Sequence, residues 1–259
     1  MTDTSAEQPH TPPDHVSTAD PVGTPEVVVF DVNETLSDMS VLADRFTAVG
    51  APDGLAGAWF SGLLRDGFAL TVTGGNPSFA DLARQSLGIQ LAGLTPDVDA
   101  AVDHIMAGFG DLPLHEDVIE GVRALHDLGI TLVTLSNGST GVAQGLLERA
   151  GIDGLFTRLL SVQDATSWKP AAAAYTYGLQ MCEVEASRAV LVAAHPWDIH
   201  GAHQAGLVGA WLNRTRATYP DYFASPDMEI GRLPELATRL AASARGAEGD
   251  SSARPATTA

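Results

Sequence analysis

The alternation of short apolar segments with longer amphipathic ones constrains the fold of this chain most. Segments of strand length alternate with segments whose apolar residues recur at helical spacing. The expected strands are 27–30, 130–138 (with its turn), 159–162, 188–195 and 207–214, and the expected helices are 116–129, 140–151, 170–184 and 198–206. This order is typical of a parallel sheet with helices on both faces. We therefore expect an α/β fold with a Rossmann-like sheet.

A second group of helical segments interrupts this pattern after the first strand. Residues 41–115 contain four stretches with helical spacing and no strand signal. Because sites in open α/β sheets lie at the carboxyl ends of the strands, we expect this insertion to form a helical cap domain over the active face. The expected core domain then comprises residues 25–40 and 116–242.

The two ends of the sequence differ in composition from the rest. Residues 1–24 are polar and rich in proline, and residues 243–259 are rich in small and polar residues. Such segments bury too little apolar surface to fold alone. We expect a disordered leader and a disordered tail.

Charge and composition exclude several classes of function. The formal net charge is −18 and no basic patch is visible, which argues against nucleic acid as a partner. No apolar run reaches the roughly 18 residues of a membrane helix, and no signal-peptide pattern is present. The single cysteine, Cys182, excludes an internal disulfide and an all-cysteine metal site. We expect a cytoplasmic protein, with a homodimer left open.

The first strand ends abruptly in an acidic residue, Asp31. The backbone N–H groups of residues 32–35 follow it and are able to form an anion-binding turn. An aspartate held there is a candidate nucleophile, because Asp forms covalent intermediates in several enzyme classes. The alternative is an Asp that only caps a turn.

Three further strand or helix junctions contain polar residues. Ser136 and Asn137 end the second core strand. Their hydroxyl, amide and backbone N–H groups are able to bind an anionic substrate group or a developing negative charge. The alternative is an ordinary turn. Lys169 precedes a proline that is expected to open a helix; folded over Asp31, it keeps that carboxylate ionised. Asp198 follows another buried strand and is a second carboxylate, which orients water, holds Lys169, or caps the next helix.

These motifs, taken in order, resemble the haloacid dehalogenase superfamily. The chain contains "DVNETL", "LSNGS", Lys169 and "HPWD" in the order of the four superfamily motifs, and the resemblance extends over residues 26–240. The closer resemblance is to the type II (S)-2-haloacid dehalogenases, on "SVQDATSWKPAAAAY", with Tyr175 six residues after Lys169, and on the Trp197–Asp198 pair. The resemblance implies a superfamily core with an inserted helical cap, and Asp31, Lys169, Asp198 and Ser136 as catalytic residues.

Asn33 separates two activities of this superfamily. The superfamily phosphatases have a second acid at this position, which protonates a poor leaving group; an amide does not replace it, and a departing halide needs no proton. We therefore expect dehalogenation of a small 2-haloacid through an ester on Asp31, with no cofactor and no metal, the partners being the anionic substrate and halide. A Mg²⁺-dependent phosphatase and a catalytically silent binding protein remain as alternatives.

The sequence departs from the type II pattern around the expected substrate. Asn33 stands where the resembling enzymes have a tyrosine, Phe60 where they have an arginine on the cap, and His195 where they have an asparagine. One interpretation is that a protonated His195 replaces the positive charge that is lost with the cap arginine. The alternative is that the His195 ring only forms a hydrogen bond with a backbone carbonyl at the end of the strand. The residues expected to bind substrate are Thr35, Asn137, Asn33, Phe60, Tyr175, His195 and Trp197.

Overall fold

The sheet of this protein is parallel throughout, as the sequence predicts. A computed structural model describes residues 24–251, so that residues 1–23 of the expected leader and 252–259 of the expected tail lie outside it. The strand order is β3-β2-β1-β4-β5-β6. The strands are β1 (Val27–Phe30), β2 (Thr131–Ser136), β3 (Arg158–Ser161), β4 (Ala189–Ala193), β5 (Val208–Leu212) and β6 (Met228–Ile230).

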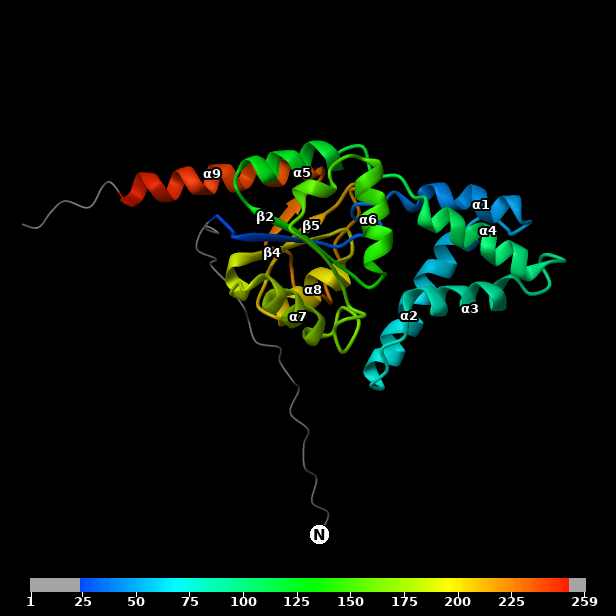
Figure 1. The fold of residues 1–259 in the computed structure, drawn as a ribbon. Helices are drawn as coiled ribbons and strands as arrows, with labels where there is room; N and C mark the ends of the chain where they lie inside the picture. Colours follow the sequence, from blue (N-terminus) through cyan, green and yellow to red (C-terminus); the bar gives the residue numbers. More distant parts are fainter. Residues whose placement is uncertain (1–23, 252–259) are drawn as a thin grey trace, which may run out of the picture.

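Helices cover both faces of the sheet (Figure 1). Alternate side chains of β1 point to opposite faces: Val28 and Phe30 join the apolar cluster beneath α5, α6 and α9, whereas Val27 and Val29 join the cluster beneath α7 and α8. Because β1 is buried on both faces, all of its side chains are apolar, which explains its VVVF sequence. The helices are α5 (Val118–Asp127), α6 (Thr140–Arg149), α7 (Ala172–Cys182), α8 (Pro196–Gln204) and α9 (Leu233–Ser251).

The segment between β1 and α5 is helical, as expected, and lies on the side of the sheet toward which β1 runs (Figure 1). Ser78 and Asp97 cap the third and fourth of its helices by accepting hydrogen bonds from Asp81 N–H and Ala100 N–H. The elements are η1 (Met39–Val41), α1 (Leu42–Ala48), α2 (Leu55–Val72), α3 (Phe79–Leu91) and α4 (Val98–Gly110). No helix within residues 24–251 is long and apolar enough to cross a membrane.

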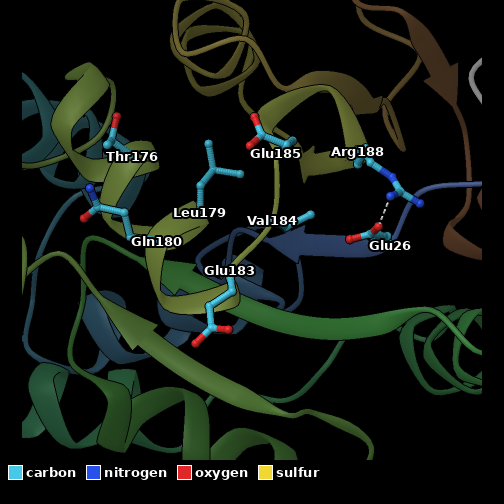
Figure 2. A pocket seen from close by; sticks show the side chains of 8 residues that line it. All are labelled: Glu26, Thr176, Leu179, Gln180, Glu183, Val184, Glu185 and Arg188. Carbon is cyan, nitrogen blue, oxygen red and sulfur yellow. Dashed lines mark ion pairs between the residues drawn. The ribbon is translucent and has the colours of Figure 1, made fainter.

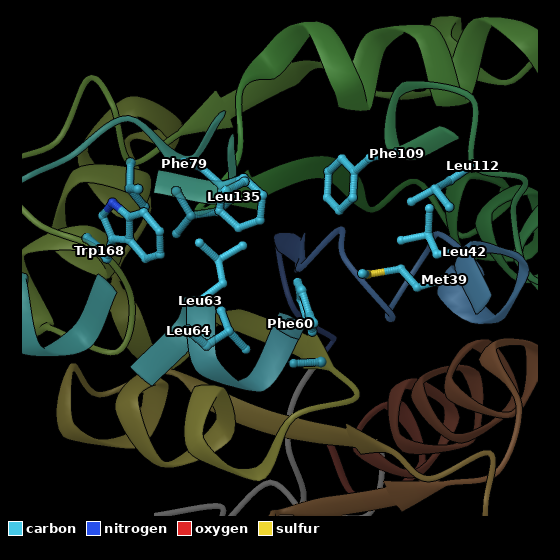
Figure 3. Close-up of a cluster of buried hydrophobic side chains, with 14 of the residues drawn as sticks. Met39, Leu42, Phe60, Leu63, Leu64, Phe79, Phe109, Leu112, Leu135 and Trp168 are labelled. Carbon is cyan, nitrogen blue, oxygen red and sulfur yellow. The ribbon is translucent and has the colours of Figure 1, made fainter. Parts of the chain in front are cut away.

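Trp168 links these helices to the sheet. Its ring stacks on Phe79 at a centroid distance of 5.6 Å, and its Nε1–H donates to the carbonyl of Pro77 over 2.9 Å. Figure 3 shows Trp168 with Leu135 of β2 among side chains of α2, α3 and α4. Asn76 adds hydrogen bonds to the carbonyls of Val162 and Ala165. The loop before Lys169 is therefore held by the inserted helices.

Three expected helix starts are each wrong by two residues, and the first is that of α5, which begins at Val118 and not at residue 116. Helix α8 begins at Pro196, two residues before the expected start at Asp198, because proline at the first helical position sacrifices no intrahelical hydrogen bond. His195 is the residue before it, so Asp198 does not cap the helix but lies in its first turn. Helix α7 begins at Ala172 rather than Pro170.

The carboxyl-terminal boundary also differs from the expectation. Helix α9 continues to Ser251, so residues 243–251 are helical rather than part of a disordered tail. The residue Leu233, at the start of α9, packs so closely on Gly121 of α5 that a Cβ there would lie 2.5 Å from its Cγ. The last strand expected from the sequence ends at residue 214, so the short strand β6 was not expected.

Candidate active site

Asp31 lies at the point where the strand order of the sheet reverses. Strand β1 pairs with β2 on one side and with β4 on the other, and Asp31 follows β1 directly. Its N–H donates to the carbonyl of Val192 over 3.0 Å, which fixes the first residue past the strand. A topological switch point is where ligands bind in open α/β sheets.

Lys169 joins Asp31 to Asp198. Its ammonium nitrogen lies 2.9 Å from Oδ1 of Asp31 and 2.6 Å from Oδ2 of Asp198. The side chains of Lys169 and Asp198 are fully buried, and that of Asp31 is 6% exposed. The three expected residues therefore meet, and one cation serves two carboxylates away from bulk water.

The charges within this group oppose the effect of burial. Burial raises the pKa of Asp31, but Lys169, His195 and the hydroxyl of Thr35 outweigh it, so the pKa lies below its ordinary value. Burial lowers the pKa of Lys169, but the two carboxylates raise it above its ordinary value. Burial, with the nearby charge of Asp31, raises the pKa of Asp198 despite its contact with Lys169. Asp31 is the carboxylate that stays ionised most readily.

Tyr175 holds the second carboxylate. Its hydroxyl lies 2.6 Å from Oδ1 of Asp198 and 3.1 Å from the carbonyl oxygen of the same residue. Burial and the charge of Asp198 raise the pKa of Tyr175 well above its ordinary value, which keeps the hydroxyl a donor. Tyr175 is 1% exposed and lies against Asp198. Its expected contact with substrate stays a prediction.

Thr35 orients the first carboxylate. Its hydroxyl donates to Oδ2 of Asp31 over 2.7 Å and accepts from the N–H of Ala194 over 2.9 Å. Thr35 is fully buried, and its contacts give it a positioning role at Asp31. Its expected contact with substrate stays a prediction. Both oxygens of Asp31 thus have a donor, and the loop after β4 is tied to the loop after β1.

Asn137 is likewise occupied by the protein itself. Its side chain accepts from the N–H of Lys169 over 2.9 Å and donates to the carbonyl of Lys169 over 3.2 Å. This pair of hydrogen bonds positions the backbone of Lys169. The expected contact of Asn137 with substrate stays a prediction. Ser136 is buried nearby and accepts from the N–H of Gly138 over 2.9 Å. Asn33 is buried beside the same glycine, its Nδ2 lying 3.9 Å from the place of a Cβ on Gly138.

Aromatic rings line one side of the site. The rings of His195 and Trp197 stack at 5.1 Å, and Phe60 of α2 approaches His195 at 6.3 Å. Phe68, on the same helix, packs edge-on against Trp197 at 5.0 Å. The structure thus brings the expected residues Phe60, His195 and Trp197 together, between α2 and the start of α8.

Glu34 is a site residue that the sequence analysis missed. Its carboxylate lies 3.4 Å from Nε2 of His195, so the nearest acid to this histidine is neither Asp31 nor Asp198. Burial and the nearby Asp31 raise the pKa of Glu34 against the opposing effect of His195. Its backbone has a positive φ of 61°, which turns the chain after Asn33. The available signal was an acid three residues after Asp31 in a turn.

A cavity of about 560 Å³ borders this site. Glu34, Ala194 and His195 form part of its wall. A second cavity, of about 370 Å³, lies at the opposite end of the sheet, where Arg188 pairs with Glu26 just before β1 (Figure 2). The first cavity is therefore the one next to the buried carboxylates.

Between residues 24 and 251 there is no cluster of three or more His, Cys, Asp or Glu residues placed to hold a metal ion. The two carboxylates at the strand tips are instead paired with the ammonium group of Lys169.

The sheet and its strand-tip residues define an α/β protein whose polar site lies at a switch point. The family model described as haloacid dehalogenase-like hydrolase matches residues 25–206. The chain belongs to this family of hydrolases.

Curated relatives divide into two groups by coverage. Haloacetate dehalogenase H-2 of Moraxella sp. is 32% identical over 114 residues, which is 44% of this chain and 51% of that protein. The chain thus spans about half the length of the curated relatives that it matches at 32% identity. (S)-2-haloacid dehalogenase H-109 of Pseudomonas putida is 25% identical over 83% of this chain and 97% of that protein.

A solved structure supports the fold. The L-2-haloacid dehalogenase from Xanthobacter autotrophicus matches with a TM-score of 0.74 and 22% identity, over 83% of this chain and 98% of that chain. At this identity the match concerns the fold alone. The match supports the fold described above, in which a helical segment is inserted between β1 and the rest of the parallel sheet.

Proposed function

We propose that this protein hydrolyses a small 2-haloalkanoic acid to the 2-hydroxy acid through an ester on Asp31. The observation that supports this best is the ionised, buried Asp31 held by Lys169, with the amide Asn33 and not an acid two residues further on. A halide leaves as a stable anion, so the reaction needs no acid at that position. The curated relatives with dehalogenase names point to the same chemistry.

In the first step, an oxygen of Asp31 attacks the Cα of the acid. The new C–O bond forms as the carbon–halogen bond breaks, and the halide leaves with the bonding electron pair. Thr35 and Lys169 hold the two carboxylate oxygens, so the nucleophile is oriented before substrate arrives. The product of this step is an aspartyl ester with inverted Cα.

In the second step, water attacks the Cγ of Asp31. Asp198 takes one proton from this water, because a carboxylate with a raised pKa is the better base. The ester C–O bond then breaks, Asp198 returns that proton to the departing alkoxide, and the 2-hydroxy acid leaves. The second water proton passes to solvent, which restores the carboxylate of Asp31. Lys169 then balances the negative charge that returns to Asp31, from its contact at 2.9 Å.

We further propose that helices α1–α4 form a cap that excludes water from Asp31. The packing of Phe60 on His195 and of Phe68 on Trp197 supports this assignment, because it closes the space above the strand tips with apolar rings. Ser136 and the amide of Asn33 are assigned to the substrate or the halide. With Phe60 in place of a cationic residue, His195 is assigned the positive charge that attracts the substrate carboxylate.

Halide release tests the proposal. Chloroacetate and 2-chloropropionate are incubated with the enzyme, with and without EDTA, beside a set of phosphate monoesters. We expect halide release that EDTA does not abolish, and no phosphate release. Phosphate release restored by Mg²⁺, with no halide, would replace this proposal with the phosphatase alternative, and no turnover of either class would favour a binding protein.

A further inference from the structure

The cavity of about 560 Å³ beside the site is larger than a two- or three-carbon acid requires. Its volume lies in the range of pockets that hold whole ligands of drug size, roughly 300–1,000 Å³. Much of its wall consists of small apolar residues and glycine, from α1, the start of α2 and the segments after β4 and β5: Ala43, Ala56, Gly57, Pro196, Ala217 and Pro220.

The cavity shares its inner wall with the site. Ala194 lines the cavity, and its N–H bonds the Thr35 hydroxyl that in turn donates to Asp31. Glu34 and His195 also line it, with side chains 45% and 14% exposed. Two hydrogen bonds, through Ala194 N–H and the Thr35 hydroxyl, therefore connect the cavity wall to the nucleophile, and the half-exposed Glu34 carboxylate faces the His195 ring in the same wall.

The charged residues of the wall are already partnered. His195 faces Glu34, and Arg214 donates to Asp117 and to the carbonyl of Thr35. His115 contacts the carbonyl of Glu34 at 3.2 Å. An anionic group in this cavity would have to compete with Asp117 for Arg214, whereas a hydrocarbon chain needs only the apolar part of the wall.

We propose, resting on the dehalogenase function above, that this cavity receives the carbon chain of a 2-haloacid longer than three carbons. The halogen-bearing Cα lies at Asp31, and the chain passes the Glu34–His195 pair into the cavity. The preferred substrate class is then a 2-halo monocarboxylic acid with a linear chain. Each methylene placed in the cavity raises kcat/KM by on the order of three- to fourfold until the chain reaches the far wall.

Gly57 offers a direct test because the structure leaves room for a side chain there. A Cβ on Gly57, in the first turn of α2, meets no atom within 4 Å, and the residue lines the cavity. Gly88, on α3, is equally open and does not line the cavity, so it is a matched control. Gly57→Phe adds a ring at the cavity wall, Gly57→Leu adds a smaller side chain there, and Gly88→Phe changes a helical glycine elsewhere.

The experiment measures kcat/KM for 2-bromopropionate and 2-bromohexanoate with the full chain and the three variants. We expect the wild type and Gly88→Phe to prefer the hexanoate. The hexanoate-to-propionate ratio should fall about tenfold in Gly57→Phe and less in Gly57→Leu. Melting curves show whether each variant is folded. If Gly57→Phe does not fold, the comparison is made with the smaller substitution Gly57→Leu.

The outcomes separate this inference from the function on which it rests. Wild-type turnover of 2-bromopropionate without preference for the hexanoate overturns the cavity assignment and leaves the dehalogenase function standing. An unchanged ratio in both Gly57 variants, or the same fall in Gly88→Phe, also overturns it. Absence of halide release from both acids contradicts the dehalogenase function and the cavity assignment together.

Discussion

Lys169 and Asp31 meet at 2.9 Å although 138 residues separate them in the chain. The contact places a cation against the proposed nucleophile, which keeps that carboxylate ionised but also attracts the electrons needed for attack. Asp198, at 2.6 Å from the same ammonium group, shares the positive charge. We infer that this sharing leaves Asp31 ionised yet still nucleophilic.

Lys169→Met should leave two buried carboxylates without a counter-charge. Breaking a buried ion pair from one side costs about 3–5 kcal/mol in the free energy of unfolding. We expect that loss at neutral pH and a fall in kcat of more than about a hundredfold. Denaturant unfolding and halide release measure the two effects, and a variant as stable and active as wild type would contradict the assigned contact.

The pH dependence of that stability loss is itself a check. In the wild type, folding lowers the pKa of Asp31 from its ordinary value of 3.8. Asp31 therefore stabilises the folded protein above about pH 4, and this stabilisation is lost as the pH falls through the pKa of Asp31 in the folded protein. Without Lys169, folding raises the pKa values of Asp31 and Asp198 because burial is no longer balanced by a cation. The folded variant is therefore destabilised at pH values at which these carboxylates are ionised in the unfolded chain. The stability deficit of Lys169→Met should therefore shrink as the pH is lowered toward about 4.

Tyr175→Phe removes the hydroxyl that donates to Oδ1 of Asp198. Because this bond lowers the pKa of Asp198, its loss should raise that pKa further. If ionised Asp198 accepts the water proton, the acid limb of kcat moves to higher pH in the variant, and kcat falls about tenfold. A reduced kcat with an unmoved acid limb would indicate a role in packing alone.

His195→Asn tests the proposed positive charge in the site. The groups near His195 are the carboxylates of Glu34 and Asp31 and the rings of Phe60 and Trp197. If a positive charge on His195 attracts the anionic substrate, His195→Asn should raise KM for the haloacid about tenfold at low salt with a smaller change in kcat, and added salt should raise the wild-type KM toward that of the variant. Equal KM values for the two proteins at low salt would end this assignment.

Gly67→Ala tests the contact between α2 and the loop before Lys169. A Cβ on Gly67 would lie within 2.8 Å of three ring atoms of Trp168, which is fully buried. The overpacking should cost about 1–3 kcal/mol in the free energy of unfolding and displace the residue next to Lys169, lowering kcat. Gly88→Ala, at an open helical position, is the control and should be neutral or stabilising.

The sheet was predictable because parallel strands buried on both faces are continuous apolar runs. The VVVF segment before Asp31 and the AVLVA segment of β4 are such runs, whereas β2 (TLVTLS) contains two threonines between its apolar residues. The positions of Asp31, Ser136 and Asp198 followed from the ends of these runs. The expected meeting of Lys169 with Asp31 followed from the resemblance and from the chemistry of a buried carboxylate, not from any periodicity.

Roles that depend on side-chain direction were not predictable. The polar atoms of Thr35, Asn137 and Tyr175 bond to Asp31, Lys169 and Asp198, and these contacts were not part of the expectation. Residue type does not reveal whether a hydroxyl or amide is satisfied internally. The αL turn at Glu34 was missed for a similar reason, since glutamate carries no local preference for positive φ.

A single turnover in ¹⁸O-labelled water tests the central role of Asp31 most directly. With enzyme in excess over 2-chloropropionate, attack of water on the Cγ of an aspartyl ester places ¹⁸O in the carboxylate of Asp31, and the product hydroxyl carries unlabelled oxygen from the enzyme. Asp31→Asn, which lacks the nucleophile, should show no turnover and no label. We expect mass spectrometry of the peptide containing Asp31 to show the label. Label in the first-turnover product, with none in that peptide, would contradict covalent catalysis by Asp31.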